Sequence, residues 1–160
     1  MRGLTAGGAA LVALLAGAPA ALAGCGGPQI LSCDLDGQTL EMLDVRGAKI
    51  VSMSLNGASI GTFEATGAEI VSIDLERATL TRANLTGAEI LRMDAQGAQL
   101  DGAVFTGAKL VDADLRQASL AGAVFTGAQF ITVDFTDADL SGALWPDGGA
   151  RAEASFGSCR

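Results

Sequence analysis

Apolar residues recur at every fifth position through most of the chain, without a shift of register. An amphipathic helix repeats its apolar positions about every 3.6 residues and a half-buried strand every second residue, so neither element explains a period of five. A chain that returns an apolar side chain inward every five residues must bend at each repeat, which predicts a solenoid. The repeat centres are Leu35, Leu40, Val45, Ile50, Leu55, Ile60, Ala65, Ile70, Leu75, Leu80, Leu85, Ile90, Ala95, Leu100, Phe105, Leu110, Leu115, Leu120, Phe125, Phe130, Phe135, Leu140 and Trp145.

A second apolar series lies two positions before the centres and consists mostly of alanine. Each five-residue unit therefore offers one large and one small inward side chain. Two units exchange the sizes, because Phe63 precedes Ala65 and Met93 precedes Ala95. Such an exchange keeps the filled volume constant, as a close-packed interior requires. The two series together predict a narrow, dry central column.

The repeat unit resembles that of the pentapeptide repeat family. Residues 83–87 are Ala-Asn-Leu-Thr-Gly and residues 113–117 are Ala-Asp-Leu-Arg-Gln, and the resemblance extends over residues 33–145. It implies an all-β fold, a right-handed quadrilateral β-helix in which four units make one coil. Residues 104–107, Val-Phe-Thr-Gly, recur at 124–127, which independently favours a coil of 20 residues. We therefore expect five to six coils.

The first 25 residues are typical of an export signal. Positive charge at the amino terminus precedes an uncharged apolar segment that runs to residue 23. The segment ends in Leu22-Ala23-Gly24-Cys25, which resembles the lipobox of bacterial lipoproteins, in which the cysteine is lipidated and becomes the first residue after cleavage. The alternative is the small-x-small motif formed by Ala21, Leu22 and Ala23, at which ordinary signal peptidase would release a soluble periplasmic protein.

Lipid on Cys25 would bind the membrane by itself, because each buried methylene contributes about 0.8 kcal/mol. The next residue is Gly26 and not the Asp that, by resemblance, retains lipoproteins at the inner membrane. We expect an exported, membrane-anchored lipoprotein on the periplasmic side of the outer membrane or on the cell surface. The predicted organisation is a signal peptide over 1–24, a lipidated tether and cap over 25–32, the solenoid over 33–145, and a terminal cap or tail over 146–160.

Composition and charge exclude several function classes. The chain contains no histidine, the side chain best suited to proton transfer near neutrality and the commonest metal ligand. No nucleophile, base and orienting group can be assembled from the remaining residues, so we expect no enzyme, no cofactor and no catalytic metal. The formal net charge of −8 argues against nucleic acid as a partner, because binding phosphates requires clustered Lys and Arg.

A 20-residue coil stacks outward positions into columns, and one of these columns is apolar. It contains the candidate interaction stripe Val51, Val71, Leu91, Val111 and Ile131. Branched side chains suit a strand surface, so self-stacking alone could explain the column. An exposed aliphatic patch of a few hundred Å² also marks interaction sites, and it would suit a homodimer or an envelope protein as partner.

A second outward column is acidic. It contains the candidate ladder Asp34, Asp74, Asp94, Asp114 and Asp134, with Ser54 in the remaining register. Carboxylates one coil apart repel each other by about 0.9 kcal/mol even in bulk water, so a compensating interaction is required. We expect each carboxylate to accept hydrogen bonds from turn amides, as Asx side chains do. A weak Ca²⁺-binding edge is the alternative.

With Cys25 acylated, Cys33 and Cys159 would remain in an oxidising compartment. They lie at opposite ends of the predicted rod, so we expect no bond between them. The function predicted from these features is that of a non-catalytic cell-envelope lipoprotein, a scaffold or protein-interaction module that works through the flat faces of the solenoid. A DNA-mimic inhibitor of a topoisomerase, resembling other members of the family, is the alternative.

Overall fold

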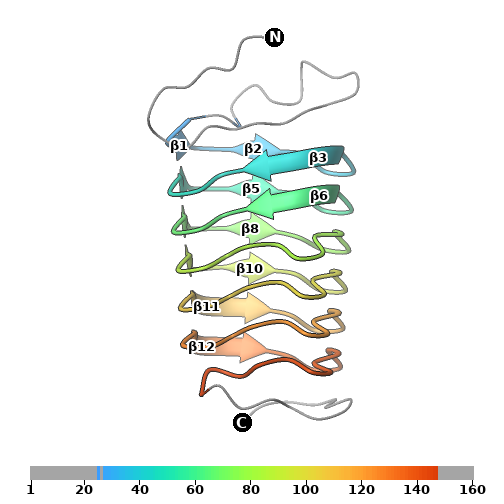
Figure 1. Ribbon diagram of the computed structural model, residues 1–160. Helices are drawn as coiled ribbons and strands as arrows, with labels where there is room; N and C mark the ends of the chain where they lie inside the picture. The colour runs from blue at the N-terminus through green and yellow to red at the C-terminus, as the bar shows by residue number, and fades with distance from the viewer. Residues whose placement is uncertain (1–24, 26, 148–160) are drawn as a thin grey trace.

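The computed structural model describes Cys25 and residues 27–147 and shows a rod of stacked coils (Figure 1). Within these residues every regular element is a β-strand and every pairing is parallel, as the sequence pattern predicts. No helix in the described part of the chain is long and apolar enough to cross a membrane.

Twelve short strands, most of them two residues long, form the sides of the coils. Their length follows from the five-residue period, since only the residues around each centre are extended before the chain bends again. The strands are β1 Gln29–Ile30, β2 Cys33–Asp34, β3 Thr39–Asp44, β4 Lys49–Ile50, β5 Met53–Ser54, β6 Ser59–Glu64, β7 Glu69–Ile70, β8 Ile73–Asp74, β9 Glu89–Ile90, β10 Met93–Asp94, β11 Lys109–Asp114 and β12 Gln129–Asp134.

Partners along the rod are always 20 residues apart. One sheet has the strand order β1-β4-β7-β9-β11-β10-β8-β5-β2, with β12 paired to β11, and β3 and β6 form a second sheet. Because β11 and β12 each bend around a corner, the first sheet covers two adjacent sides of the rod. Isolated bridges, such as Thr79 with Gln99 and Asn84 with Val104, continue the other two sides. The 20-residue coil with four sides is therefore confirmed.

The predicted centres form the core. Every centre from Leu35 to Leu140 is buried except Phe130, which is half-buried, as is Trp145. The exchanged pairs are buried together, Phe63 with Ala65 and Met93 with Ala95. At the carboxyl end of the described rod the core is aromatic, because Phe125 stacks on Phe105 at 5.0 Å. Phe125 also meets Trp145 edge-on at 5.5 Å.

The solenoid begins earlier than the predicted boundary at residue 33. The pair Gln29 and Ile30 already stacks on Lys49 and Ile50, and the carbonyl of Pro28 accepts a hydrogen bond from the amide of Lys49. Ile30 and Cys25 continue the five-residue series toward the amino terminus, and both are fully buried. The part of the chain expected to be a tether and cap thus contributes β1 to the first coil.

Candidate functional site

The residues of the predicted interaction stripe lie along one corner of the rod, where four of them are exposed and Val111 is half-buried. Three of them directly follow β4, β7 and β9, and the other two lie within β11 and β12, where the chain bends onto the next side. The amide of Val71 donates to the carbonyl of Ile50 and the amide of Leu91 to that of Ile70, which keeps the column in register. The stripe is therefore a ridge between two sides and not the flat face expected from the sequence.

One member of the stripe was missed in the sequence pattern. Leu31 lies 20 residues before Val51, and its side chain is 75% exposed, more than that of any other large hydrophobic residue described. It was missed because it lies between Ile30 and Cys33, in the part of the chain predicted to be a tether. Extending the 20-residue spacing back from Val51 would have identified it. We use "the stripe" below for all six residues: Leu31, Val51, Val71, Leu91, Val111 and Ile131.

Polar columns flank the stripe on both sides. On one side a groove is lined by Ile50, Val51, Ile70, Val71 and Leu91 together with the charged column that begins with Lys49 and Glu69. Lys49 and Glu69 form an ion pair at 2.9 Å. The first flanking column is Gln29, Lys49, Glu69, Glu89, Lys109 and Gln129, and the second is Ser32, Ser52, Ser72, Arg92, Asp112 and Thr132.

The predicted acidic ladder also stacks as expected. The Cα partners run from Asp34 through Ser54 to Asp74, and onward through Asp94 and Asp114 to Asp134. The carboxylates of Asp34, Asp94, Asp114 and Asp134 each accept a hydrogen bond from the amide two residues later, at 2.8 to 3.2 Å. These bonds close turns, so four of the five carboxylates have the Asx role expected from the sequence, and among the described residues Asp74 does not make this bond.

Neighbouring groups move the carboxyl pKa values in both directions. A side-chain hydrogen bond from Arg116 lowers the pKa of Asp114, and the guanidinium lies 2.6 Å from the carboxylate. The Thr136 hydroxyl lowers the pKa of Asp134 in the same way. Burial, followed by the charge of Asp94, raises the pKa of Asp74. The ladder therefore reduces its own repulsion through turn amides, a guanidinium and a hydroxyl.

The described residues contain no group of three or more Cys, Asp or Glu side chains placed to hold a metal ion. In the ladder, carboxylate oxygens that a cation would need already accept bonds from the protein, as in Asp114 and Asp134. The arrangement can close turns and present charge, and it contains no pairing of a nucleophile with a base.

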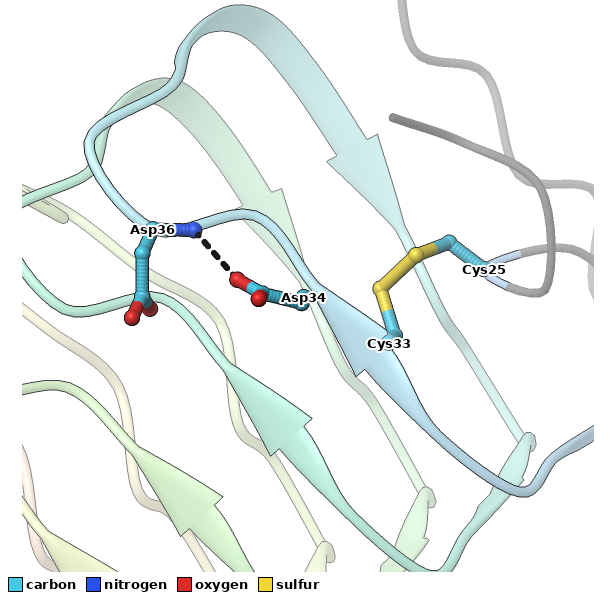
Figure 2. The surroundings of a disulfide bond; sticks show 4 residues. All are labelled: Cys25, Cys33, Asp34 and Asp36. Atoms are coloured by element: carbon cyan, nitrogen blue, oxygen red, sulfur yellow. Dashed lines mark hydrogen bonds between the residues drawn. A yellow bond between two sulfur atoms is a disulfide. The ribbon is translucent and has the colours of Figure 1, made fainter. Parts of the chain in front are cut away.

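Cys25 and Cys33 form a disulfide at the amino-terminal end of the rod, with their Cα atoms 4.9 Å apart (Figure 2). Cys33 begins β2 and occupies an inward position, and both side chains are buried. The predicted lipidation of Cys25 requires the same sulfur, and a sulfur atom in a disulfide cannot carry a thioether-linked lipid. Lipidation of Cys25 therefore stays a prediction, and it cannot occur in a molecule that contains the disulfide between Cys25 and Cys33.

The remaining predicted features of the ends fall outside the described residues. They are the lipobox residues Leu22, Ala23 and Gly24, and also Cys159. Cys33 is bonded to Cys25, so it is not the unbonded thiol that acylation of Cys25 was expected to leave.

Comparison with known proteins agrees with the geometry of the coils. The sequence model of the pentapeptide repeats matches eight copies, over residues 66–107, 92–120 and 108–144. The chain belongs to the pentapeptide repeat family. Proteins of this family are generally structural or interaction modules and not enzymes. A search of curated protein sequences found no match.

Solved pentapeptide repeat structures are similar to this chain at low sequence identity. Rfr23 from the cyanobacterium Cyanothece 51142 is 22% identical, with a TM-score of 0.49, over 74% of this chain and 91% of that one. QnrB1, a plasmid-mediated fluoroquinolone resistance protein, is 22% identical with a TM-score of 0.41, over 72% of this chain and 59% of that one. HetL from Nostoc sp. strain PCC 7120, involved in regulating heterocyst differentiation, is 19% identical with a TM-score of 0.28, over 77% and 92%. At these levels no function is transferred.

Proposed function

We propose that this pentapeptide repeat protein is an exported, non-catalytic interaction module that pairs with a second copy of itself along the stripe. One observation carries the proposal. Of the six large hydrophobic residues that are exposed in the described part of the chain, five belong to the stripe, and the sixth is Leu144. An alignment of exposed apolar side chains along a whole rod marks an interaction surface, whereas scattered single residues do not.

The length of the stripe suits an extended partner of the same shape. Its six residues span five steps between coils, which corresponds to roughly 24 Å at about 4.8 Å per step. A globular partner would meet only part of such a narrow ridge. A second rod lying alongside would cover every member, together with the polar columns on both flanks.

The flanking charges favour a second copy of this chain in a parallel arrangement. A two-fold axis parallel to the rod places each coil against the same coil of the partner and brings the first flanking column opposite the second. Glu89 then faces Arg92, and Lys109 faces Asp112, and the symmetry repeats each pair. In each of the other coils one of the two facing residues is Ser or Thr, so no like charges meet.

An antiparallel arrangement is less complete. Charges also match when the axis passes between the coils of Leu91 and Val111, because Glu89 again faces Lys109. However, Val71 then meets Ile131, and Leu31 and Val51 extend beyond the partner's stripe. Only the parallel arrangement covers all six apolar residues and matches the charges.

Export is the second part of the proposal. A disulfide within the first coil supports an oxidising compartment, because cytosolic thiols are kept reduced. Export would also separate the chain from a cytosolic topoisomerase, and no contact among the described residues favours that alternative. The absence of catalysis is supported by the carboxylates of the ladder, which are occupied in turns.

The first experiment measures the molar mass of the purified mature protein by light scattering at 5 to 100 µM. We expect a dimer whose dissociation constant rises at least 30-fold in Val71→Glu. The matched control is Leu144→Glu, since Leu144 and Val71 are each 37% exposed and only Val71 belongs to the stripe. A monomeric wild-type protein at 100 µM would exclude self-pairing and leave a different envelope protein as the occupant.

The second experiment tests the parallel register. In a Cys159→Ser background, Leu91→Cys should form an intermolecular disulfide with the same residue of the partner, whereas Leu144→Cys should not. Arg92→Glu should weaken the dimer about 10-fold, and adding Glu89→Arg should restore its affinity. Cross-linking of Leu91→Cys to Val111→Cys in a mixture, without self-linking of either, would contradict the parallel arrangement.

A further inference from the structure

We infer that Cys25 is a structural half-cystine and not a lipid attachment site, so that the mature protein is released without a membrane anchor after cleavage behind Ala23. The chemical state of the Cys25 sulfur determines both the cleavage site and whether the protein is attached to a membrane. This inference depends on the disulfide and not on the stripe, so the two proposals can fail separately.

The position of Cys25 within the coil carries the first step. Residues 25 and 30 continue the five-residue series whose later members are Leu35, Leu40 and Val45. Like them, Cys25 and Ile30 belong to the buried core, with exposures of 0% and 1%. Cys25 therefore lies at an inward position at the amino-terminal end of the apolar column.

The partner of Cys25 is held in place by the coil. Cys33 begins β2, pairs with Met53 across the sheet, and donates its amide to the carbonyl of Ser52. Its Cα atom lies 4.9 Å from that of Cys25, within the range that a disulfide spans (Figure 2). Cys33, which is held in β2, thus fixes the position of the Cys25 sulfur.

The two fates of the Cys25 sulfur exclude each other. Lipidation would replace the thiol proton with a diacylglyceryl carbon and form a thioether. Two long acyl chains attached to this sulfur could not extend to a membrane while the sulfur is enclosed in the core. Disulfide formation removes two protons and two electrons from Cys25 and Cys33. The oxidant that accepts them is the disulfide of a thiol-oxidising enzyme in the export compartment, which is reduced to two thiols.

The amino-terminal sequence permits the second fate without any change. Ala21 and Ala23 form the small-x-small motif of ordinary signal peptidase. Cleavage behind Ala23 leaves Gly24 as the first residue and keeps Cys25 inside the chain, with its thiol free to be oxidised. The motif that resembles a lipobox shares Leu22 and Ala23 with this cleavage site.

The test uses the full chain, exported from a bacterium with two membranes. Intact mass and peptide mapping should give a mature protein that begins at Gly24, is found in the soluble periplasmic extract, and contains a linked pair of Cys25 and Cys33 peptides. Iodoacetamide should modify these two cysteines only after reduction. An amino-terminal, diacylglyceryl-modified Cys25 in the membrane fraction would overturn the inference, as would alkylation of both thiols without reduction.

The variant Cys25→Ser separates the two processing routes even if the first coil loses stability. Lipoprotein processing requires the cysteine, so on that route the variant would accumulate as an uncleaved precursor. We expect instead that it is cleaved behind Ala23 at the wild-type rate and released, with Cys33 now open to alkylation. Cys33→Ser is the matched control, which should be processed identically and expose the thiol of Cys25.

Discussion

Breaking the disulfide between Cys25 and Cys33 should destabilise one end of the rod and not the whole. The bond joins residues eight positions apart. The chain-entropy relation for a closed loop of that length gives about 2.5 kcal/mol at 25 °C. In a solenoid each coil contacts only its neighbours, so the loss is confined to the first coil and its interface with the second.

The expected size of the effect follows from this free energy. At about 1.36 kcal/mol for each factor of ten, 2.5 kcal/mol raises the open population of the first coil roughly 70-fold. The affected amides donate between the first two coils: Cys33 to Ser52, Lys49 to Pro28 and Val51 to Ile30. Their exchange should accelerate by this factor after reduction.

Hydrogen exchange followed by mass spectrometry, with and without a phosphine reductant, measures this difference. The double variant Cys25→Ala/Cys33→Ala should match the reduced wild type, and Cys159→Ser serves as the background that removes the third thiol. Peptides containing the amide of Phe125, which donates to the carbonyl of Leu144, provide the internal control. Equal acceleration at both ends of the rod, or less than a threefold change in the first coil, would refute the reasoning.

Three further outcomes are expected from single changes. Phe125→Ala removes a fully buried ring that stacks on another aromatic side chain and should lower the free energy of unfolding by about 4 kcal/mol in urea titrations. Gly61→Ala would bring a Cβ to 2.8 Å from the carbonyl oxygen of Glu41 and should lower the free energy of unfolding by about 1 to 3 kcal/mol. Gly61→Ser adds the same Cβ and should be no better tolerated. The pKa of Asp114 is lowered in the folded state. Its contribution to the free energy of unfolding is therefore present above the ordinary carboxyl pKa and is lost as the pH falls through the folded value. In thermal unfolding from pH 6 to pH 2, Asp114→Asn should lose less stability than the wild type.

The inward and outward directions of the side chains could be predicted from sequence because they follow a local rule. Each five-residue unit repeats the same bend, so the centres from Leu35 onward must face one common interior, and the 20-residue recurrence then defines the outward columns. Five residues of the stripe and the acidic ladder were found in this way. The Asx role of the ladder was also predictable, since a carboxylate two residues before a turn amide is a local arrangement.

The bend at Val111 and Ile131 illustrates what local pattern does not define. A period of five places both side chains outward, but whether they lie on a side or at a corner depends on how the coil closes. β11 and β12 run through the bend, with a left-handed φ of 50° at Asp112 and 57° at Thr132. The predicted flat face is therefore a ridge.

The coil, its period, its core and the columns on its surface follow from the amino-acid pattern alone, because all of these repeat and any one unit contains the information. The contacts at the amino-terminal end follow only from the way in which the chain folds. There closure of the first coil brings Cys25 to Cys33. Contacts of this kind occur once and not in every coil, so no periodicity reports them.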